Sequence, residues 1–111
     1  MISSGRYALI QFRKFGRMEL AVSEPPHKEF PVTVTGTRAS GVYAGGKNKE
    51  LAKLFIAYLA SEEYNMNIVR DADALPPNPK YTGIEEFKHP KEYPNEWGCH
   101  EAFANAARKI A

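Results

Sequence analysis

Cys99 and His100 are the residues whose types most directly suggest catalysis, because a histidine can activate a cysteine as a nucleophile. They are neighbours in the sequence, however, and neighbours in a helix point about 100° apart, so their side chains do not face each other. The pattern favours a small buried cysteine beside a surface histidine. His27 and His89 lie far from His100 and lack the spacing of zinc ligands. We therefore expect no catalytic residue, no metal and no cofactor.

Two acidic pairs and one glycine pair also have simple explanations. Glu62 and Glu63 lie at an expected helix start, where the positive end of the helix dipole favours anions, and Glu85 and Glu86 are expected in solvent. The "GGK" at Gly45–Lys47 lacks the spacing of a phosphate-binding loop. Its glycines are expected to let the chain turn sharply into the following helix.

The loop Gly36–Gly41, "GTRASG", is a better candidate for binding a small polar ligand. Held between strands, it can present backbone amides, the guanidinium of Arg38 and the hydroxyl of Ser40. A plain connecting loop is an equally good interpretation. Three aromatic residues either stack on a sugar ring or close a core beneath a long loop: Trp97, Tyr93 and Tyr81. For Trp97 we favour a ligand or an interface.

The elements that position these residues are expected to include both strands and helices. Tyr7–Phe12 is a short apolar run that predicts a buried strand, and Arg13–Val22 predicts a short helix interrupted at Gly16. Two further strands are predicted at Val32–Thr35 and Val42–Ala44. The proline-rich stretch that ends near Asn95 is expected to be a loop with one short helical turn.

The helix expected after Asn48, its candidate N-cap, has the clearest period. Its apolar residues recur at i, i+3, i+4, i+7 and i+8, which predicts a buried face made of Leu51, Leu54, Phe55, Tyr58 and Leu59. Ser61 is expected to cap a second helix that runs to about Asp71. A C-terminal amphipathic helix is predicted by six residues at helical spacing: Cys99, Ala102, Phe103, Ala106, Ala107 and Ile110.

Composition limits the class of protein. The chain has 111 residues, of which 43% are hydrophobic and 25% charged, which suits one domain. Its net charge is +2 with Lys and Arg spread along the chain, so nothing marks a nucleic-acid or anionic-membrane binder. The single cysteine excludes an internal disulfide. We expect neither a membrane span nor a secretory leader in this chain.

The order of these segments resembles the C-terminal portion of an extracellular solute-binding protein of ABC importers, the sugar-binding group known as family 1. Ser3–Phe12, "SSGRYALIQF", is similar to a family segment that leads into a strand. Lys47–Asn65, "KNKELAKLFIAYLASEEYN", closely resembles the family's helix of the form K-N-K-E-x-A-x-x-F-x-x-[FY]-L-x-S-x-E. Ala74–Asn78, "ALPPN", resembles its apolar and proline stretch after the second helix.

This resemblance implies an α/β fold, a fragment of a periplasmic-binding-protein-like (type II) lobe, with residues 1–111 as a single partial domain. It implies a non-catalytic substrate-binding component of an ABC-type carbohydrate importer, which binds a neutral sugar or polyol in a cleft between two lobes. The importer's membrane subunits are the implied partners and the periplasm or another extracytoplasmic site is the implied location. By position in the family, the ligand-binding candidates are Arg13, Phe15, Arg38, Ser40, Tyr43 and Trp97.

Half of a cleft cannot close on a ligand, so we expect this chain alone to bind sugars weakly or not at all and to self-associate through uncovered surfaces. Two other hypotheses stay open. One is a small homodimeric interaction domain with no small-molecule ligand. The other is a small cytosolic enzyme in which Cys99, His100 and Arg38 cluster.

Overall fold

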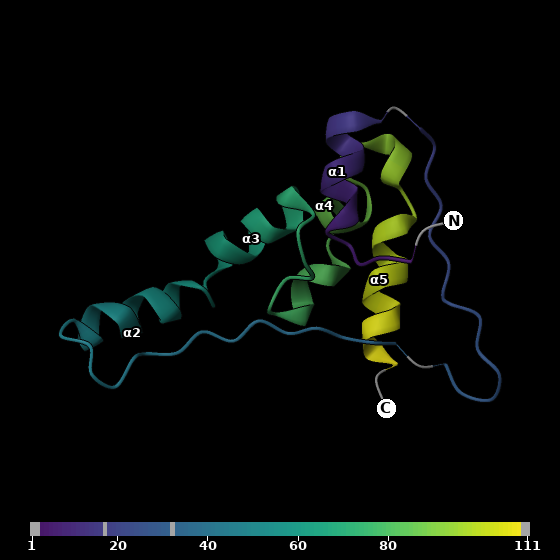
Figure 1. Cartoon of the computed structure of the whole chain (residues 1–111). Helices are drawn as coiled ribbons and strands as arrows, with labels where there is room; N and C mark the ends of the chain where they lie inside the picture. The colour runs from purple at the N-terminus through teal and green to yellow at the C-terminus, as the bar shows by residue number, and fades with distance from the viewer. Residues whose placement is uncertain (1–2, 17, 32, 110–111) are drawn as a thin grey trace.

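Short helices make up the regular structure of residues 3–16, 18–31 and 33–109, the part of the chain that this computed structural model describes. In Figure 1, α1, α4 and α5 form one group, from which α3 and then α2 extend to one side. In chain order the elements are α1 (Ala8–Phe15), α2 (Lys49–Tyr58), α3 (Glu62–Asp71), the 3₁₀ helix η1 (Pro79–Gly83), α4 (Glu85–Lys88), the 3₁₀ helix η2 (Pro94–Glu96) and α5 (Cys99–Arg108).

The predicted α/β fold is wrong, because none of these described residues lies in a strand. Most of the expected strand Tyr7–Phe12 belongs to α1 instead. The chain here buries the side chains of Arg6, Leu9 and Arg13. These residues are spaced i, i+3 and i+7, so they share one face of a helix. Two of them are arginines, and an apolar pattern alone therefore does not reveal this face.

The predicted short helix at Arg13–Val22 is present only as the end of α1. Gly16 is extended, and its N–H bonds to the carbonyl of Phe12, which ends the helix there. Residues 18–22 have no helical structure, and Arg17 lies outside the described residues.

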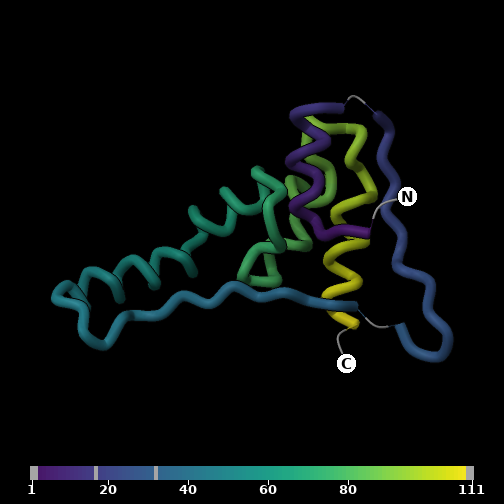
Figure 2. Tube along the Cα trace, viewed as in Figure 1, coloured from purple at the N-terminus to yellow at the C-terminus, as the bar shows by residue number. Residues whose placement is uncertain are grey.

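The two other predicted strands lie in a long connection without regular structure. Figure 2 shows this connection leaving the end of α1, passing α5 and crossing to the far end of α2. Val32 is outside the described residues, and the rest of the Val32–Thr35 stretch has no partner strand, with Val34 96% exposed. At Val42–Ala44 the chain enters a turn. A strand is stable only where neighbours accept its backbone hydrogen bonds, and no other described segment provides them.

Helix α2 forms where expected, but its predicted buried face is wrong. No residue of α2 is buried, and Leu51, Leu54 and Phe55 are 66%, 67% and 61% exposed. The ring of Tyr58 contacts that of Tyr64, with centroids 5.9 Å apart. The helical period is therefore correct while the packing that it implies is absent, because no described element covers this face.

The break between α2 and α3 confirms the predicted cap. Ser61 is extended, and its hydroxyl oxygen accepts a hydrogen bond from the backbone N–H of Tyr64 at 3.2 Å. Glu62 and Glu63 occupy the first turn of α3, where carboxylates favour the helix dipole. The helix ends at Asp71, as predicted.

We expect the Ser61→Ala variant to lose about 1 kcal/mol of stability, since the first turn of α3 loses its side-chain acceptor. Asn48→Ala is the matched control, because the Asn48 side chain makes no capping hydrogen bond to α2. Urea denaturation of both variants measures the difference. Equal destabilisation by the two substitutions would contradict the assigned role of Ser61.

The core lies where α3, η1, α4 and α5 meet. Val69, Tyr81, Phe87 and Ala104 form one buried apolar cluster, and Met66, Leu75 and Ile84 pack against it. Asn65 ties the proline-rich segment to α3: it is fully buried, donates to the carbonyl of Ser61 at 2.7 Å and accepts from the N–H of Asn78 at 2.9 Å. That segment, expected as a loop with one turn, contains η1, α4 and η2.

Helix α5 is present as predicted, but its buried face is rotated. Cys99, His100 and Ala104 are buried, and the other predicted positions are half-buried, apart from Ile110, which lies outside the described residues. The expectation of a surface histidine is wrong, because His100 is fully buried. Both of its ring nitrogens have hydrogen-bonding partners, which is what makes its burial tolerable.

The chain is more extended than a compact domain of its size. Its radius of gyration is 16.3 Å, compared with about 13 Å for a compact chain of this length. Its accessible surface of 8564 Å² exceeds the value for a folded monomer of this mass by roughly 2,400 Å². Helix α2 and the long connection account for the exposed apolar side chains most distant from the core.

Candidate functional site

A buried ion pair joins α1 to η2. Arg13 donates from Nε to Glu96 Oε1 and from Nη2 to Glu96 Oε2, both at 2.8 Å. The side chain of Glu96 is fully buried and that of Arg13 is 8% exposed. The guanidinium also lies 3.8 Å from the centre of the Tyr93 ring. Two parallel hydrogen bonds fix the orientation of the pair, so the end of α1 is held against the turn before α5.

Arg6 and His100 extend this pair into the core. Arg6 Nε donates to His100 Nδ1 at 3.1 Å, and His100 Nε2 lies 3.0 Å from Glu96 Oε2. Because Nδ1 accepts from Arg6, a neutral His100 ring carries its proton on Nε2 and donates it to Glu96. Arg6, Arg13, Glu96 and His100 form one continuous set of contacts, which we call the buried network.

The two arginines of the buried network also complete the C-terminal end of α3. The last carbonyls of a helix lack partners within it, and cations are favoured there by the helix dipole. Arg13 Nη1 donates to the carbonyl of Arg70 at 2.6 Å. Arg6 donates to three further backbone carbonyls, those of Ile68, Val69 and Ala74. Its guanidinium lies 4.6 Å from the centre of the Phe87 ring.

The electrostatics of the buried network suit a structural role. Burial raises the pKa of Glu96, but hydrogen bonds from His100 and Arg13 and the Arg13 charge outweigh it, so this pKa lies below its ordinary value. Burial, together with the charge of Arg13, lowers the pKa of Arg6 to about 10, so Arg6 stays protonated near neutral pH. Among the described residues, no buried side-chain nitrogen or oxygen lacks a partner. The network therefore has no free group directed at a ligand.

Cys99 and Arg38 have partners of their own, apart from His100. The Cys99 thiol donates to the carbonyl of Leu20 at 3.6 Å, and burial raises its pKa, which favours the unreactive thiol form. Arg38 Nη1 contacts Asp73 Oδ2 at 3.1 Å on the surface. These contacts give no support to a nucleophilic site built from the three residues.

An open, mainly apolar groove lies at the start of α2. We call it the Tyr43 groove; its volume is about 280 Å³ and its lining is Val42, Tyr43, Gly46, Lys47, Asn48, Lys49 and Ala52. The N–H of Gly46 bonds to the carbonyl of Tyr43 at 3.0 Å, which closes a turn, as the glycine pair predicts. A Cβ at Gly45 would lie 2.9 Å from the Tyr43 ring, so a glycine is needed for the ring to fold back over the turn. An exposed aromatic ring is thus held beside a mainly apolar hollow.

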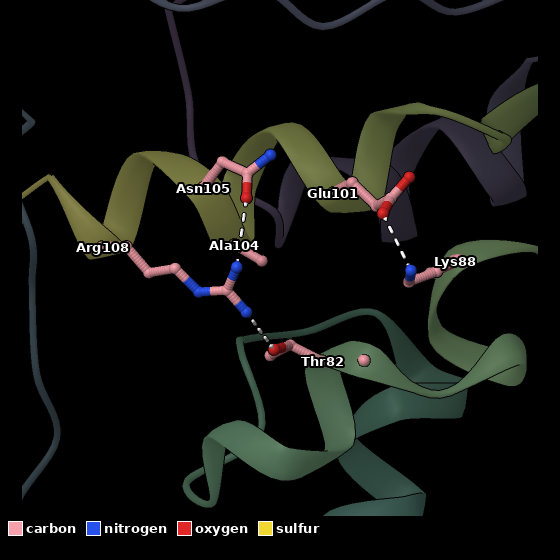
Figure 3. Close-up of a pocket in the computed structure, with 7 residues that line it drawn as sticks. Thr82, Lys88, Glu101, Ala104, Asn105 and Arg108 are labelled. Carbon is pink, nitrogen blue, oxygen red and sulfur yellow. Dashed lines mark hydrogen bonds and ion pairs between the residues drawn. The ribbon is translucent and has the colours of Figure 1, made fainter.

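A second, smaller hollow lies between η1 and α5, as Figure 3 shows. Its volume is about 70 Å³, far below the roughly 300 Å³ at which ligand pockets begin. Lys88 pairs with Glu101 at 3.2 Å, and Arg108 contacts Thr82 and Asn105 at 3.4 Å each. Its polar groups are occupied with one another, so we do not regard it as a ligand site.

The structure places the six predicted ligand-binding residues in three parts of the chain, namely α1, the long connection before α2, and the residue after η2. No hydrogen bond or ion pair joins any two of them in the part of the chain that is described. They are Arg13, Phe15, Arg38, Ser40, Tyr43 and Trp97. In Figure 1 the turn before α2 lies at the left end of the molecule, well away from α1. Their shared role in ligand binding stays a prediction.

Each of these residues has a distinct setting. Arg13 belongs to the buried network, and Phe15 is 84% exposed at the end of α1. Ser40 is exposed in the long connection. Trp97 is 52% exposed; its Nε1 donates to the carbonyl of Pro90 at 3.0 Å, and its ring lies edge-on to His89. Of the six, only Tyr43 lines the groove at the start of α2.

Sequence reasoning missed the buried network and the groove beside Tyr43. Glu96 and His100 are spaced i, i+4, which is the one local signal that could have joined them. Arg6 and Arg13 are distant in sequence from both and carry no such signal. Asn48 was expected as a cap, whereas in the structure its side chain makes no capping bond and lines the groove.

Residues 3–16, 18–31 and 33–109 include neither a metal-binding cluster nor a helix that could span a membrane. No group of three or more His, Cys, Asp or Glu side chains there could hold a metal ion. None of the helices there is both long and apolar enough to span a bilayer.

Comparisons with known proteins identify no relative of this chain. No family model, no curated protein and no solved structure matches the chain.

Proposed function

We propose that this chain is part of the substrate-binding component of an ABC-type carbohydrate importer and contacts a neutral sugar without catalysis. The observation that carries the proposal is the Tyr43 groove, which lies directly before the helix unit of α2 and α3. That unit spans the segment most similar to the sugar-binding family, and Ser61 caps its second helix. The proposal rests on this resemblance and on the chemistry of the groove together.

The apolar surface of the Tyr43 groove suits the C–H face of a sugar ring. Sugars are held by an aromatic face against their C–H surface and by a few directed polar groups at their hydroxyls. Tyr43 is 79% exposed and offers its ring. The Asn48 amide can donate and accept, and the ammonium groups of Lys47 and Lys49 can donate.

The groove is one wall of a site rather than a closed cleft. Its volume of about 280 Å³ lies just below the roughly 300 Å³ at which ligand pockets begin. In the proposal, the remaining contacts come from other parts of the importer's binding component, and the importer's membrane subunits receive the loaded protein outside the cytoplasm. Phe15, Arg38, Ser40 and Trp97 stay candidates for contacts in that larger assembly, and Arg13 supports the fold through Glu96.

Titration of the isotope-labelled chain with neutral monosaccharides and disaccharides, followed by NMR, tests this proposal. We expect millimolar binding, with shifts confined to the amides of Tyr43, Gly46, Asn48 and their neighbours. Tyr43→Ala should weaken binding at least tenfold, because aromatic stacking is its main apolar contact. Tyr7→Ala, which removes another exposed aromatic ring, is the matched control and should have no effect.

Three outcomes would overturn the proposal. One is the absence of saturable shifts at the groove for every sugar tested. Another is equal loss of binding in the Tyr43 and Tyr7 variants, which would indicate non-specific contact with aromatic rings. The third is binding of inorganic phosphate and sugar phosphates but not of neutral sugars, which would reassign the groove to an anion held by Lys47 and Lys49.

A further inference from the structure

The first part of the long connection lies along α5. At the start of α5 the Cys99 thiol donates to the carbonyl of Leu20 at 3.6 Å. Just past the end of α5, Lys109 Nζ contacts Glu24 Oε1 at 2.6 Å. An extended chain covers about 13 Å in four residues, and a helix rises about 15 Å in ten, so these two contacts run the segment along the helix. Figure 2 shows the connection beside α5. We call residues 18–24 the strap.

The strap has one side against the protein and one side in solvent. Its residues alternate in burial from one to the next: Leu20, Val22 and Glu24 are half-buried, and Glu19, Ala21 and Ser23 are exposed. A period of two is the pattern of an extended segment that lies on a surface. The strap therefore covers α5 without becoming part of the core.

Few interactions hold the strap in place. Besides its two contacts with α5, its first residue, Met18, accepts a hydrogen bond from Asn95 Nδ2 at 3.1 Å. A thiol is a weak donor, and the partly exposed pair of Glu24 and Lys109 adds little stability. No backbone N–H of the strap donates to another residue of the described ranges. Segments with so few internal contacts open locally at a small part of the free energy of global unfolding.

Helix α5 is held by contacts that the strap does not make. Ala104 belongs to the apolar core cluster, and His100 is bonded to Arg6 and Glu96 in the buried network. Opening of the strap leaves all of these contacts in place. Cys99, in contrast, is 1% exposed with its Sγ directed at the strap, so the strap is the cover that separates this thiol from solvent.

From these observations we propose that the strap opens while α5 stays packed, and that this opening controls access to Cys99. In the closed state the thiol is covered and unreactive. In the open state it is exposed although the core remains folded. A group attached to Cys99 has no room beneath the closed strap, so modification of the thiol holds the strap open.

Alkylation of the full chain by iodoacetamide, followed by mass spectrometry, tests the proposal. The thiolate displaces iodide and the thiol proton passes to solvent, so the single cysteine gains one carbamidomethyl group. We expect alkylation at least tenfold slower than in the urea-unfolded chain, because reaction requires an open strap. At low urea concentrations the rate should hardly change, since local opening exposes little surface.

Substitutions in the strap should speed the alkylation. Glu24→Gln and Lys109→Met should each raise the rate about threefold, because both remove the same contact. They change the net charge in opposite directions, so an increase in both cannot come from the electric field at the thiol. Leu20→Ser should raise the rate about tenfold through lost apolar burial. Phe30→Ser, at an exposed residue of the connection beyond the strap, is the control and should have no effect.

Several results would overturn the proposal. A rate that rises steeply from the lowest urea concentrations would show that Cys99 reacts only after global unfolding. A rate equal to that of the unfolded chain would show that the strap does not cover the thiol. Opposite effects of the Glu24 and Lys109 substitutions, or no effect of either, would remove the assigned role of their contact. Far-UV circular dichroism of each variant establishes that its helices are intact, and the two charge variants alone suffice if Leu20→Ser does not fold.

Discussion

Replacing Arg6 with methionine is expected to destabilise the protein by about 3–5 kcal/mol, because its cation joins a buried set of polar groups that would lose their donor. The side chain donates to His100 Nδ1 and to backbone carbonyls at the end of α3. Methionine fills the space of the aliphatic part of Arg6 but not that of its guanidinium, so the loss reports the hydrogen bonds together with a small cavity. A small domain has only about 5–15 kcal/mol of stability, so the variant should be largely unfolded at moderate temperature.

Arg38→Met is the matched control for this substitution. It removes the same type of side chain from an ion pair in which Arg38 is 84% exposed, and such pairs contribute about 0–1 kcal/mol. Urea denaturation followed by circular dichroism gives both values. Similar losses for the Arg6 and Arg38 variants would contradict the central place of Arg6 in the fold.

Replacing Glu96 with glutamine is expected to cost a similar amount, about 3–5 kcal/mol. The two carboxylate oxygens accept three hydrogen bonds from Arg13 and His100. A glutamine amide has one accepting oxygen, so its NH₂ group would face another donor and leave the Arg13 cation poorly compensated. Glu86→Gln, at a half-exposed residue 3.7 Å from Arg70, is the control and should cost no more than about 1 kcal/mol.

The pH dependence of stability distinguishes loss of the Glu96 charge from a simple change of shape. The pKa of Glu96 is lowered in the folded protein, so the unfolded chain binds more protons near the ordinary carboxyl value of 4.5. The stabilisation from Glu96 is therefore fully present above that pH and is lost as the pH falls through the folded pKa. Glu96→Gln should remove this part of the acid dependence. If the stability of Glu96→Gln falls with decreasing pH in the same way as that of the original protein, another carboxylate causes the loss.

Local signals in the sequence predicted the elements whose causes are local. Ser61 and the two glutamates after it predict the start of α3, and the structure has a hydroxyl cap at that position. The helical period also predicts α2 and α5 close to their observed bounds. Caps, dipoles and periodicity act within a few residues, so a single sequence contains the information for them.

The errors come from interactions between distant residues. Tyr7–Phe12 is apolar enough for a strand, yet it becomes a helix because Arg6 and Arg13 find acceptors on α3, η2 and α5. These acceptors lie more than 50 residues away along the chain. The strand predicted at Val42–Ala44 does not form, because no described segment offers it a partner for backbone hydrogen bonds.

The candidate site was predicted in part. Tyr43 was named from the family resemblance, and the structure places it in a groove. The glycine pair correctly predicted the turn that holds its ring. Asn48 was assigned to a cap because Asn is favoured there, and helix statistics contain no signal that its side chain would line a groove instead. Arg13 was predicted to meet a ligand, and its observed contacts are with Glu96 and Tyr93.

The hydrogen bond between Arg6 and His100 spans 94 residues of chain. Before it can form, the unfolded chain must bring its two ends together, and the length-dependent part of that entropy cost is about 4 kcal/mol. This is comparable to the loss expected when Arg6 or Glu96 is replaced. The docking of α1 is therefore the least favoured step while the rest of the chain is unstructured. Helices α3, α4 and α5 lie closer together in the chain and meet at a lower entropic cost. A covalent link between α1 and α5 would remove most of this difference, which makes that pair of helices the place where a cross-link would stabilise the protein most.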